Sequence, residues 1–349
     1  MLDEIIISID AMGGDNAPEV VIKGIDYFLK HEGKNRNAKF LLHGNKDKLS
    51  KLLKKSNLTS NCSVILHTEK FIEMDAKPSH ALRRGKGSSM WNSIESVKDN
   101  VANVAVSAGN TGALMAMSKL QLRMKPGLTR PAIVATWPQK NDWCVVLDVG
   151  ANIECDEIQL TEFAILGDAF YRALHKKDKP TVGLLNVGTE ELKGNAVIKA
   201  AHERLSGGHI NLNYKGYIEG TDISNGNIDV VVTDGFTGNI ALKTAEGTAK
   251  LIGYFFNKAL FGNLWSKITT FANSYSLLRL KRQIDPRRAN GGVFLGLNGI
   301  IIKSHGGTDH IGYANAIGVA LNLAESSFMS EIDTSLDLLH KNEAERSFK

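Results

Sequence analysis

Glycines and small polar residues follow six short apolar runs in this chain of 349 residues. These turns are residues 9–16 (IDAMGGDN), 106–112 (VSAGNTG), 147–154 (LDVGANIE), 185–191 (LNVGTEE), 232–239 (VTDGFTGN) and 303–309 (KSHGGTD). Glycine-rich turns that lead into helices present backbone N–H groups to anions. The six turns therefore predict one site that binds an anionic ligand.

Motifs that the chain lacks limit the classes of anionic ligand that we expect it to bind. It contains no G-x-G-x-x-G dinucleotide fingerprint, no P-loop, no G-x-S-x-G nucleophile elbow and no H-E-x-x-H zinc motif. Its three cysteines show no C-x-x-C spacing, which argues against a zinc site and a disulfide framework. These absences favour inorganic phosphate or the phosphoryl group of a small substrate, with no metal and no cofactor.

The elements around these turns alternate between β-branched runs and amphipathic segments. We expect a doubly wound α/β fold with a mostly parallel sheet, whose strands end at one edge and form a ligand crevice there. One catalytic domain is expected over residues 1–335, as one body or two lobes, before a polar C-terminal tail over 336–349. Residues 107–116 and 233–242 look like one strand–turn–helix unit used twice. The expected strands are 4–10, 39–44, 63–68, 103–109, 131–137, 143–150, 181–188, 228–235 and 299–306, and the expected helices are 17–31, 111–124, 157–175, 191–206, 238–253 and 312–330.

Composition and charge predict a soluble, cytoplasmic protein. The chain is 43% hydrophobic and 23% charged, with a net charge of +5. No apolar run approaches the ~20 residues that span a bilayer, and Asp3 and Glu4 stand where a signal peptide would be basic. Basic clusters at 82–87, 175–179 and 278–288 are either solvated faces or docking sites for an acidic partner or an anionic membrane. Nucleic acid is not an expected partner, because these clusters lack interleaved aromatic residues.

Segment 255–282 is expected to form an amphipathic helical projection. Its apolar residues recur at helical spacing and include Phe261, Leu264, Trp265, Ile268 and Phe271. Such a stripe is typical of a core or a dimer interface. With a basic rim it is also typical of a helix that lies on a membrane surface, which would make the protein peripherally membrane-associated. The sequence leaves these alternatives open.

Longer motifs resemble those of a known family. The motifs include SIDAMGGDNAPEVVIKG (8–24), AVSAGNTGALMA (105–116), LDVGANIECDEIQLTEFAILG (147–167), GLLNVGTEELKGN (183–195) and KSHGGTD (303–309). Together they resemble the bacterial phosphate acyltransferases of the PlsX family, over about residues 4–320. The match is least clear over 250–290.

The resemblance implies a fold akin to phosphotransacetylases and isopropylmalate dehydrogenase, usually as a homodimer. It implies a reaction in which orthophosphate attacks the thioester of an acyl-loaded acyl carrier protein. The products are an acyl phosphate and the free carrier, and the acyl phosphate serves phospholipid synthesis. It further implies that a membrane-bound glycerol-3-phosphate acyltransferase consumes the product.

This chemistry suits the residues of the turns. Phosphate needs little deprotonation and a thiol with a pKa near ~8.5 leaves readily, so no serine or cysteine nucleophile is required. The site must position phosphate and donate hydrogen bonds to the developing oxyanion. We expect catalytic roles for Lys303, His305, Asn110 and Asp234, and carrier docking by Arg83 and Arg84. Phosphate or substrate binding is expected of Asp10, Gly13, Gly14, Asn16, Gly109, Thr111, Gly112, Asn186, Lys193, Gly235, Thr237, Asn239 and Ser304.

Most of these residues have a structural alternative. Asn110 and Asp234 stand where helix caps are expected, a histidine after an apolar strand is often only structural, and the arginines also suit a solvated face. Three rival functions stay open: a phosphotransacetylase that uses a coenzyme A thioester, an NAD-dependent decarboxylating dehydrogenase of the isopropylmalate type, and a non-enzymatic binding module. The dehydrogenase would need an arginine cluster and metal-binding aspartates, and we find no convincing set of either.

Overall fold

The computed structural model describes residues 4–33, 36–140, 142–208, 210–261 and 285–347. Its strands are β1 (Ile5–Asp10), β2 (Ala38–Gly44), β3 (Ser63–His67), β4 (Val104–Ser107), β5 (Ala132–Pro138), β6 (Trp143–Leu147), β7 (Thr181–Leu185), β8 (Asn213–Ile218), β9 (Val230–Val232), β10 (Gly292–Leu295) and β11 (Ile300–Lys303). Its helices are α1 (Glu19–His31), α2 (Lys46–Leu53), α3 (Asn57–Asn61), α4 (Pro78–Arg84), α5 (Ser89–Lys98), α6 (Thr111–Leu122), α7 (Glu157–His175), α8 (Ala196–Ser206), α9 (Gly235–Phe261), α12 (His310–Glu325) and α13 (Phe328–Ser347).

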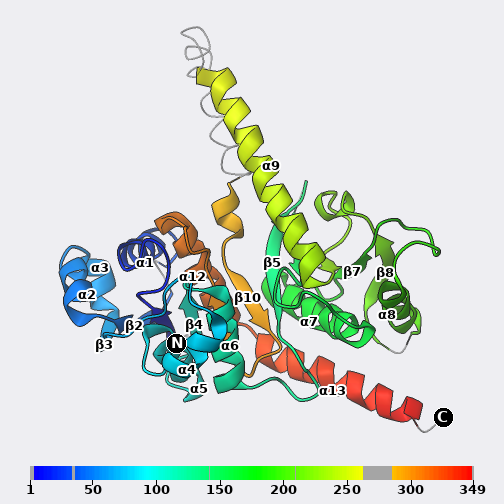
Figure 1. Ribbon diagram of the computed structural model, residues 1–349, viewed down its shortest axis with the longest axis horizontal. Coiled ribbons are helices and arrows are strands. Elements are labelled where there is room, and N and C mark those ends of the chain that lie inside the picture. The colour runs from blue at the N-terminus through cyan, green and yellow to red at the C-terminus, as the bar shows by residue number, and fades with distance from the viewer. Residues whose placement is uncertain (1–3, 34–35, 141, 209, 262–284, 348–349) are drawn as a thin grey trace.

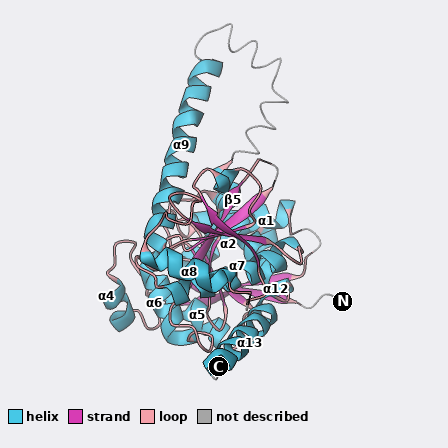
Figure 2. Ribbon diagram, turned by 90° about the vertical axis from the view of Figure 1, so that its right-hand side faces the viewer, coloured by secondary structure: helices cyan, strands magenta, loops and turns pink. Residues whose placement is uncertain are grey.

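One sheet of eleven strands runs through the molecule in the order β3-β2-β1-β4-β11-β10-β5-β6-β9-β7-β8. Helices cover both faces of this sheet, and α9 projects far from the body (Figures 1 and 2). The expected α/β fold with a mostly parallel sheet is therefore confirmed.

The first strand shows why the parallel strands are apolar on both faces. Ile5, Ile7 and Ile9 are buried in a cluster that includes residues of α1 and α12. The side chain of Ser8 points to the opposite face, where its hydroxyl lies 3.0 Å from Nε2 of His43. The same nitrogen lies 3.1 Å from the hydroxyl of Ser96 in α5. A strand enclosed between helices in this way buries nearly every side chain.

Antiparallel pairing in the middle divides the sheet into two parallel sets. β10 pairs antiparallel with β11 and β5, and β5 pairs antiparallel with β6. On one side lie β3-β2-β1-β4-β11 and on the other β6-β9-β7-β8, all parallel within their set. Each set contains one copy of the unit that the sequence repeats, β4 with α6 and β9 with α9. The turns after the strands consequently form two sets as well.

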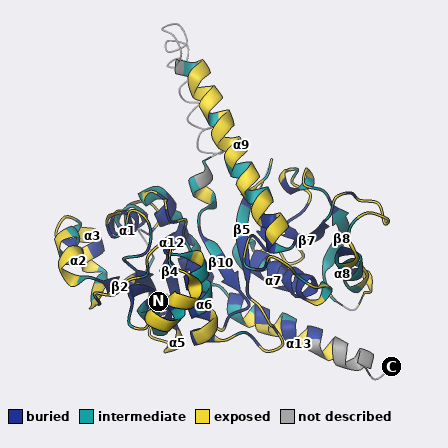
Figure 3. Ribbon diagram, viewed as in Figure 1, coloured by how far each residue is buried: buried dark blue, intermediate teal, exposed yellow. Residues whose placement is uncertain are grey.

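Several elements differ from those expected. β8 and β10 are additional strands, and the expected helix 312–330 is instead two helices that are separated at Ser326 and Ser327. Residues 336–347, expected as a polar tail, belong to α13, because Leu336 and Leu339 are buried in the core. α9 continues to Phe261 and its outer part is largely exposed (Figure 3). The rest of the expected projection, from 262 onward, lies outside the described residues.

Candidate active site

Three glycine-rich turns, after β1, β4 and β11, interlock at the carboxyl edge of the first parallel set. A Cβ atom at Gly13 would lie 2.3 Å from Oδ2 of Asp10 and 2.9 Å from the backbone nitrogen of Gly109. The next residue, Gly14, has a φ of +111°, and the backbone N–H of Asp15 donates to the carbonyl of Gly306 at 3.0 Å. Only glycine fits the close approach at position 13, so the backbones of these three of the six turns lie together.

The carboxyl group of Asp10 lies beneath these turns. Its side chain is buried, and Oδ2 accepts a hydrogen bond from the Ser107 hydroxyl at 2.7 Å. The Ser107 hydroxyl also accepts from the backbone N–H of Gly109 at 3.0 Å. Burial raises the pKa of Asp10, and the hydrogen bond from Ser107 opposes this shift. Asp10 therefore connects the turns after β1 and β4, and its expected part in phosphate or substrate binding stays a prediction.

Lys303, at the end of β11, places a cation at the junction of the three turns. Its side chain is partly buried, and Nζ donates to the carbonyls of Ala108, at 3.4 Å, and Ser304. Burial lowers the pKa of Lys303 to about 8, while the nearby charges of Asp10 and Asp15 act in the opposite direction. A lysine with a pKa this close to neutrality is suited to binding an anion and to transferring a proton.

Ser304 and His305 are held by a residue that the sequence did not single out, Asn290. Its amide donates to the Ser304 hydroxyl at 2.9 Å and to the carbonyl of Gly312 at 2.6 Å, and its oxygen accepts from the backbone N–H of His305 at 2.8 Å. Asn290 lies in a turn before β10, a strand that was not expected, so no sequence signal placed it beside β11.

His305 is exposed in the turn after β11, and charged residues of α9 act on its imidazole. Its Nδ1 accepts a hydrogen bond from the backbone N–H of Gly307 at 3.2 Å, so the neutral ring carries its proton on Nε2. Partial desolvation of the ring lowers the pKa of His305, the positive charge of Lys243 in α9 lowers it further, and the carboxylate of Glu246 acts in the opposite direction. His305 is therefore largely neutral at physiological pH and can donate from Nε2.

Asn110 has both ends of its amide occupied by backbone partners. Its oxygen caps α6 by accepting from the N–H of Ala113 at 2.9 Å, and its nitrogen donates to the carbonyls of Met74, at 2.7 Å, and Ala76, at 3.2 Å. These contacts favour the capping alternative. Thr111 is exposed, Gly112 lies against Pro78, and Asn16 is exposed after the first turn.

A second set of turns follows β6, β9 and β7. Asp234 caps α9 by accepting from the backbone N–H of Thr237 at 2.8 Å and from its hydroxyl at 2.7 Å. The nearby Asp148, which the sequence did not single out, is buried and accepts from the backbone N–H groups of Ile133, Gly150, Ala151 and Asn152. Gly235 lies so close that a Cβ atom would be 2.8 Å from Oδ2 of Asp148.

The remaining candidates of this second set are more exposed. Asn239 is exposed and lies beside Gly150. Asn186 donates to the carbonyl of Gly188 at 3.0 Å and so holds its own turn, in which Lys193 is exposed. The sheet order places β10 and β5 between the two sets. The structure thus groups Asp10, Gly13, Gly14, Gly109, Lys303, Ser304 and His305 around the first set, and Asn186, Lys193, Asp234, Gly235, Thr237 and Asn239 around the second.

The docking and membrane candidates lie away from these turns. Arg83 and Arg84 are exposed in the last turn of α4, which packs against α6. Phe261 is the last residue of α9. Leu264, Trp265, Ile268 and Phe271 lie outside the described residues.

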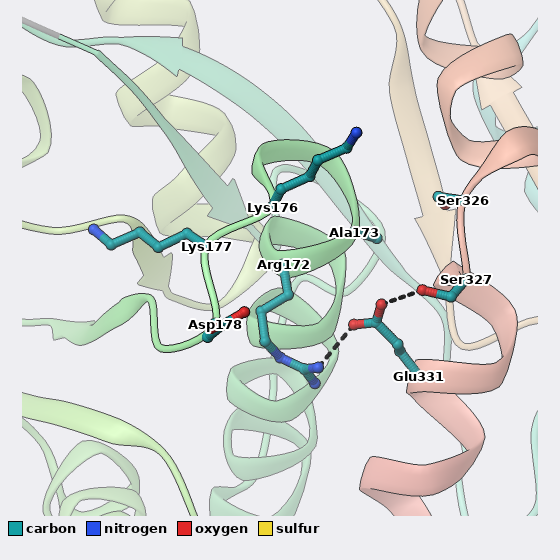
Figure 4. A pocket seen from close by; sticks show the side chains of 8 residues that line it. All are labelled: Arg172, Ala173, Lys176, Lys177, Asp178, Ser326, Ser327 and Glu331. Atoms are coloured by element: carbon teal, nitrogen blue, oxygen red, sulfur yellow. Dashed lines mark hydrogen bonds and ion pairs between the residues drawn. The ribbon is translucent and has the colours of Figure 1, made fainter.

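A cavity of about 320 Å³ lies elsewhere, where the end of α7 meets the junction of α12 and α13 (Figure 4). Two of its three cationic residues are engaged by acidic neighbours: Arg172 pairs with Glu331 at 2.7 Å and with Asp168 at 2.8 Å, and Lys177 pairs with Asp229 at 2.7 Å. Because α7 leads from β6 back to the start of β7, this cavity lies toward the amino ends of the strands of the second set, away from the turns that follow them. It is not part of the candidate site.

Two further features bear on the site. Within the described ranges, no helix is long and apolar enough to cross a lipid bilayer. Within the same ranges, no group of three or more His, Cys, Asp or Glu side chains is arranged to hold a metal ion.

Comparison with known proteins identifies the family. Residues 5–331 match the family model described as "Fatty acid synthesis protein". The chain is 52% identical over 332 residues to a phosphate acyltransferase of Maricaulis maris, covering 95% of this chain and 94% of that protein. It is 49% identical to a phosphate acyltransferase of Caulobacter vibrioides, covering 97% and 93% of the two chains. The chain belongs to the phosphate acyltransferase family.

Solved structures with little sequence similarity share the fold of this chain. A phosphotransacetylase from Streptococcus pyogenes superposes with a TM-score of 0.59 at 17% identity, covering 92% of this chain and 94% of that chain. A putative 4-hydroxythreonine-4-phosphate dehydrogenase from Salmonella typhimurium superposes with a TM-score of 0.52 at 14% identity, covering 92% and 99%. The expected fold relation to phosphotransacetylases is confirmed, and the dehydrogenase that shares the fold here is a 4-hydroxythreonine-4-phosphate dehydrogenase, where an isopropylmalate dehydrogenase was expected. The activity class comes from the family: the chain is an acyltransferase that transfers an acyl group to phosphate.

Proposed function

We propose that the chain transfers the acyl group of an acyl-loaded acyl carrier protein to orthophosphate, and that the acyl phosphate enters phospholipid synthesis. The observation that carries the proposal is the partly buried ammonium group of Lys303 at the junction of three glycine-rich turns. With a pKa of about 8, Lys303 is mostly protonated at neutral pH. Phosphate would replace contacts to carbonyl oxygens with a stronger, charge-assisted partner.

In the proposed mechanism an oxygen of phosphate forms a bond to the thioester carbonyl carbon, and the bond between that carbon and sulfur then breaks. Lys303 and the backbone N–H groups of the turns orient the phosphate. Nε2–H of His305 donates to the oxygen that becomes negative during attack. The departing thiolate takes a proton, and Lys303 can supply it because its pKa is close to that of a thiol.

The preference for the carrier over coenzyme A is tested by comparing the two thioesters. We expect kcat/KM for palmitoyl-acyl carrier protein to exceed that for palmitoyl-coenzyme A at the same phosphate concentration. Turnover with the coenzyme A thioester alone would assign the chain to the phosphotransacetylase class of activity.

We propose that Arg83 and Arg84 dock the carrier. Both are exposed at the end of α4, which packs against α6, the helix that begins at the turn after β4. The double variant Arg83→Glu/Arg84→Glu is expected to raise KM for the carrier thioester without a matching change for the coenzyme A thioester. Lys54→Glu, on the exposed end of α2, is the matched control. Equal effects on both thioesters would contradict carrier docking.

We further propose a homodimer that pairs through the outer half of α9 and a cytoplasmic protein that associates peripherally with the membrane. Apolar side chains are exposed there in a short run: Leu251, Ile252, Tyr254, Phe255 and Phe256. Such a surface favours burial against a second copy, and the segment that follows is proposed to contact the membrane, where the acyltransferase that consumes the product resides. Light scattering of Phe255→Ser/Phe256→Ser and liposome flotation of Trp265→Ser/Phe271→Ser test the two contacts separately. An unchanged mass, or unchanged flotation, would contradict the respective contact.

A further inference from the structure

Large apolar side chains are exposed in the second set of turns. Ile153 follows β6, Val187 and Leu192 follow β7, and Phe236 and Ile240 lie at the start of α9 after β9. Their exposed fractions are 74%, 81%, 88%, 59% and 50%, respectively. Turns at a strand end are normally polar, and each exposed apolar side chain forgoes the stabilisation that burial would give. We call these five residues the apolar edge.

The members of the apolar edge come from neighbouring strands. β9 lies between β6 and β7 in the sheet, and Leu184 of β7 pairs with Val232 of β9. A Cβ atom at Gly235, just before Phe236, would lie 2.5 Å from the carbonyl oxygen of Asn152, just before Ile153. Because adjacent strands are about 4.8 Å apart, the three turns span about 10 Å. They form one surface.

One face of α9 connects the apolar edge with the first set of turns. Phe236, Ile240 and Lys243 are spaced four and three residues apart, so they share a face of the helix. The pairing registers align Leu147 at the end of β6 with Ile302 near the end of β11, three strands away, so the two sets of turns begin about 14 Å apart. The charge of Lys243 also acts on His305 in the turn after β11. From Phe236 to Lys243 the helix rises about 10 Å. An extended ligand could therefore reach from Lys303 and His305 along α9 to the apolar edge.

We propose that the apolar edge binds the acyl chain of the thioester substrate, with the reacting carbonyl at Lys303 and His305. The proposal rests on the proposed function, since it takes the first set of turns as the phosphate site. The carbonyl must lie beside phosphate, and the hydrocarbon that starts at this carbon must continue onto an apolar surface. The first set is tightly packed around polar groups, whereas the second set and the start of α9 expose the five apolar side chains of the apolar edge.

The experiment compares chain-length preference in wild type, Val187→Ser/Leu192→Ser and Ile240→Ser. All three positions are exposed, so the variants should fold normally. We expect the ratio of kcat/KM for palmitoyl to acetyl thioester to fall by roughly tenfold or more in each, as the loss of a few methylene contacts implies. Leu58→Ser in α3, where the side chain is 46% exposed, is the matched control and should keep the wild-type ratio.

The outcomes separate the alternatives. An unchanged ratio of kcat/KM for the palmitoyl to the acetyl thioester, including an equal loss with both of these substrates, would overturn the proposal. An unchanged ratio with loss of dimer mass in light scattering would assign the apolar edge to a second copy instead. Binding of a fluorescent long-chain fatty acid to the same variants gives a readout that does not need turnover. If the wild type showed no phosphate-dependent turnover, the proposed function would fail, while weaker fatty acid binding by the variants would still support the acyl site.

Discussion

Replacing Lys303 with methionine should raise the stability of the protein and lower its activity, which separates the effect of this lysine on folding from its role in phosphate binding. Burial lowers the pKa of Lys303 from 10.5 to about 8, and a shift of this size corresponds to about 3 kcal/mol of cost for holding the charge in the folded protein at neutral pH. Methionine has a similar length and no charge. We therefore expect Lys303→Met to unfold with a free energy up to about 3 kcal/mol higher than wild type at pH 7.

The pH dependence of this difference has a defined sign. The folded-state pKa is depressed, so the cost of the Lys303 charge is fully present below pH 8 and is lost as the pH rises from about 8 to 10.5. The stability advantage of the variant should shrink over this range. Denaturant unfolding of wild type and Lys303→Met at pH 7 and pH 10 measures this change in the stability difference.

The activity of Lys303→Met should fall, although its stability should rise. A hydrogen bond to a charged group contributes about 1.5–3 kcal/mol, so kcat/KM for phosphate should fall by roughly 10-fold to 150-fold in Lys303→Met. In wild type, kcat/KM for phosphate should decline as the pH rises through about 8, because the ammonium group loses its proton. A variant that is less stable but retains the wild-type phosphate dependence would refute the reasoning and make Lys303 structural.

Three further predictions concern the surroundings. Burial lowers the pKa of His43 from 6.5 to about 4. The free energy of unfolding of the wild type should therefore drop by about 3 kcal/mol as the pH falls from 6.5 to 4, and that of His43→Gln should drop by less. Equal drops for the two proteins in denaturant titrations would contradict this. Asn290→Ala removes three hydrogen bonds and should lower the free energy of unfolding by about 2–3 kcal/mol in chemical denaturation. A loss within error would show that the hydrogen bonds of Asn290 do not stabilise the fold. Gly13→Ala should reduce both turnover and stability, because its Cβ would lie 2.3 Å from an oxygen of Asp10, whereas Gly220→Ala, with no atom within 4 Å, should leave both unchanged.

Local sequence patterns were sufficient to predict features that depend on a single strand and the turn after it. The apolar run of β1 predicts a strand enclosed on both faces, and the glycines after it predict a close turn, which the contact between Gly13 and Asp10 bears out. Two strands could not be predicted from the local pattern. β8 is an edge strand whose residues are mostly partly exposed, so it lacks a continuous apolar run. β10 is a buried central strand, but its four residues form too short an apolar run to stand out.

Features that depend on pairing between distant segments could not be predicted. Asn290 supports Ser304 and His305 only because β10 pairs antiparallel with β11. Asp148 satisfies four backbone N–H groups of its surroundings, which becomes visible only in the folded turn. The division of the turns into two sets likewise follows from the antiparallel strands in the middle of the sheet. The sequence could suggest the residues of the site but not their separation.

The central claim is that orthophosphate attacks a carrier-bound thioester, and it is tested most directly by following the release of carrier thiol. Purified protein is incubated with palmitoyl-acyl carrier protein, with and without orthophosphate, and the acyl product is trapped with hydroxylamine. We predict thiol release that requires phosphate and yields palmitoyl hydroxamate, with both signals strongly reduced in Lys303→Met. Release at the same rate without phosphate, or no release from the carrier thioester, would contradict the claim.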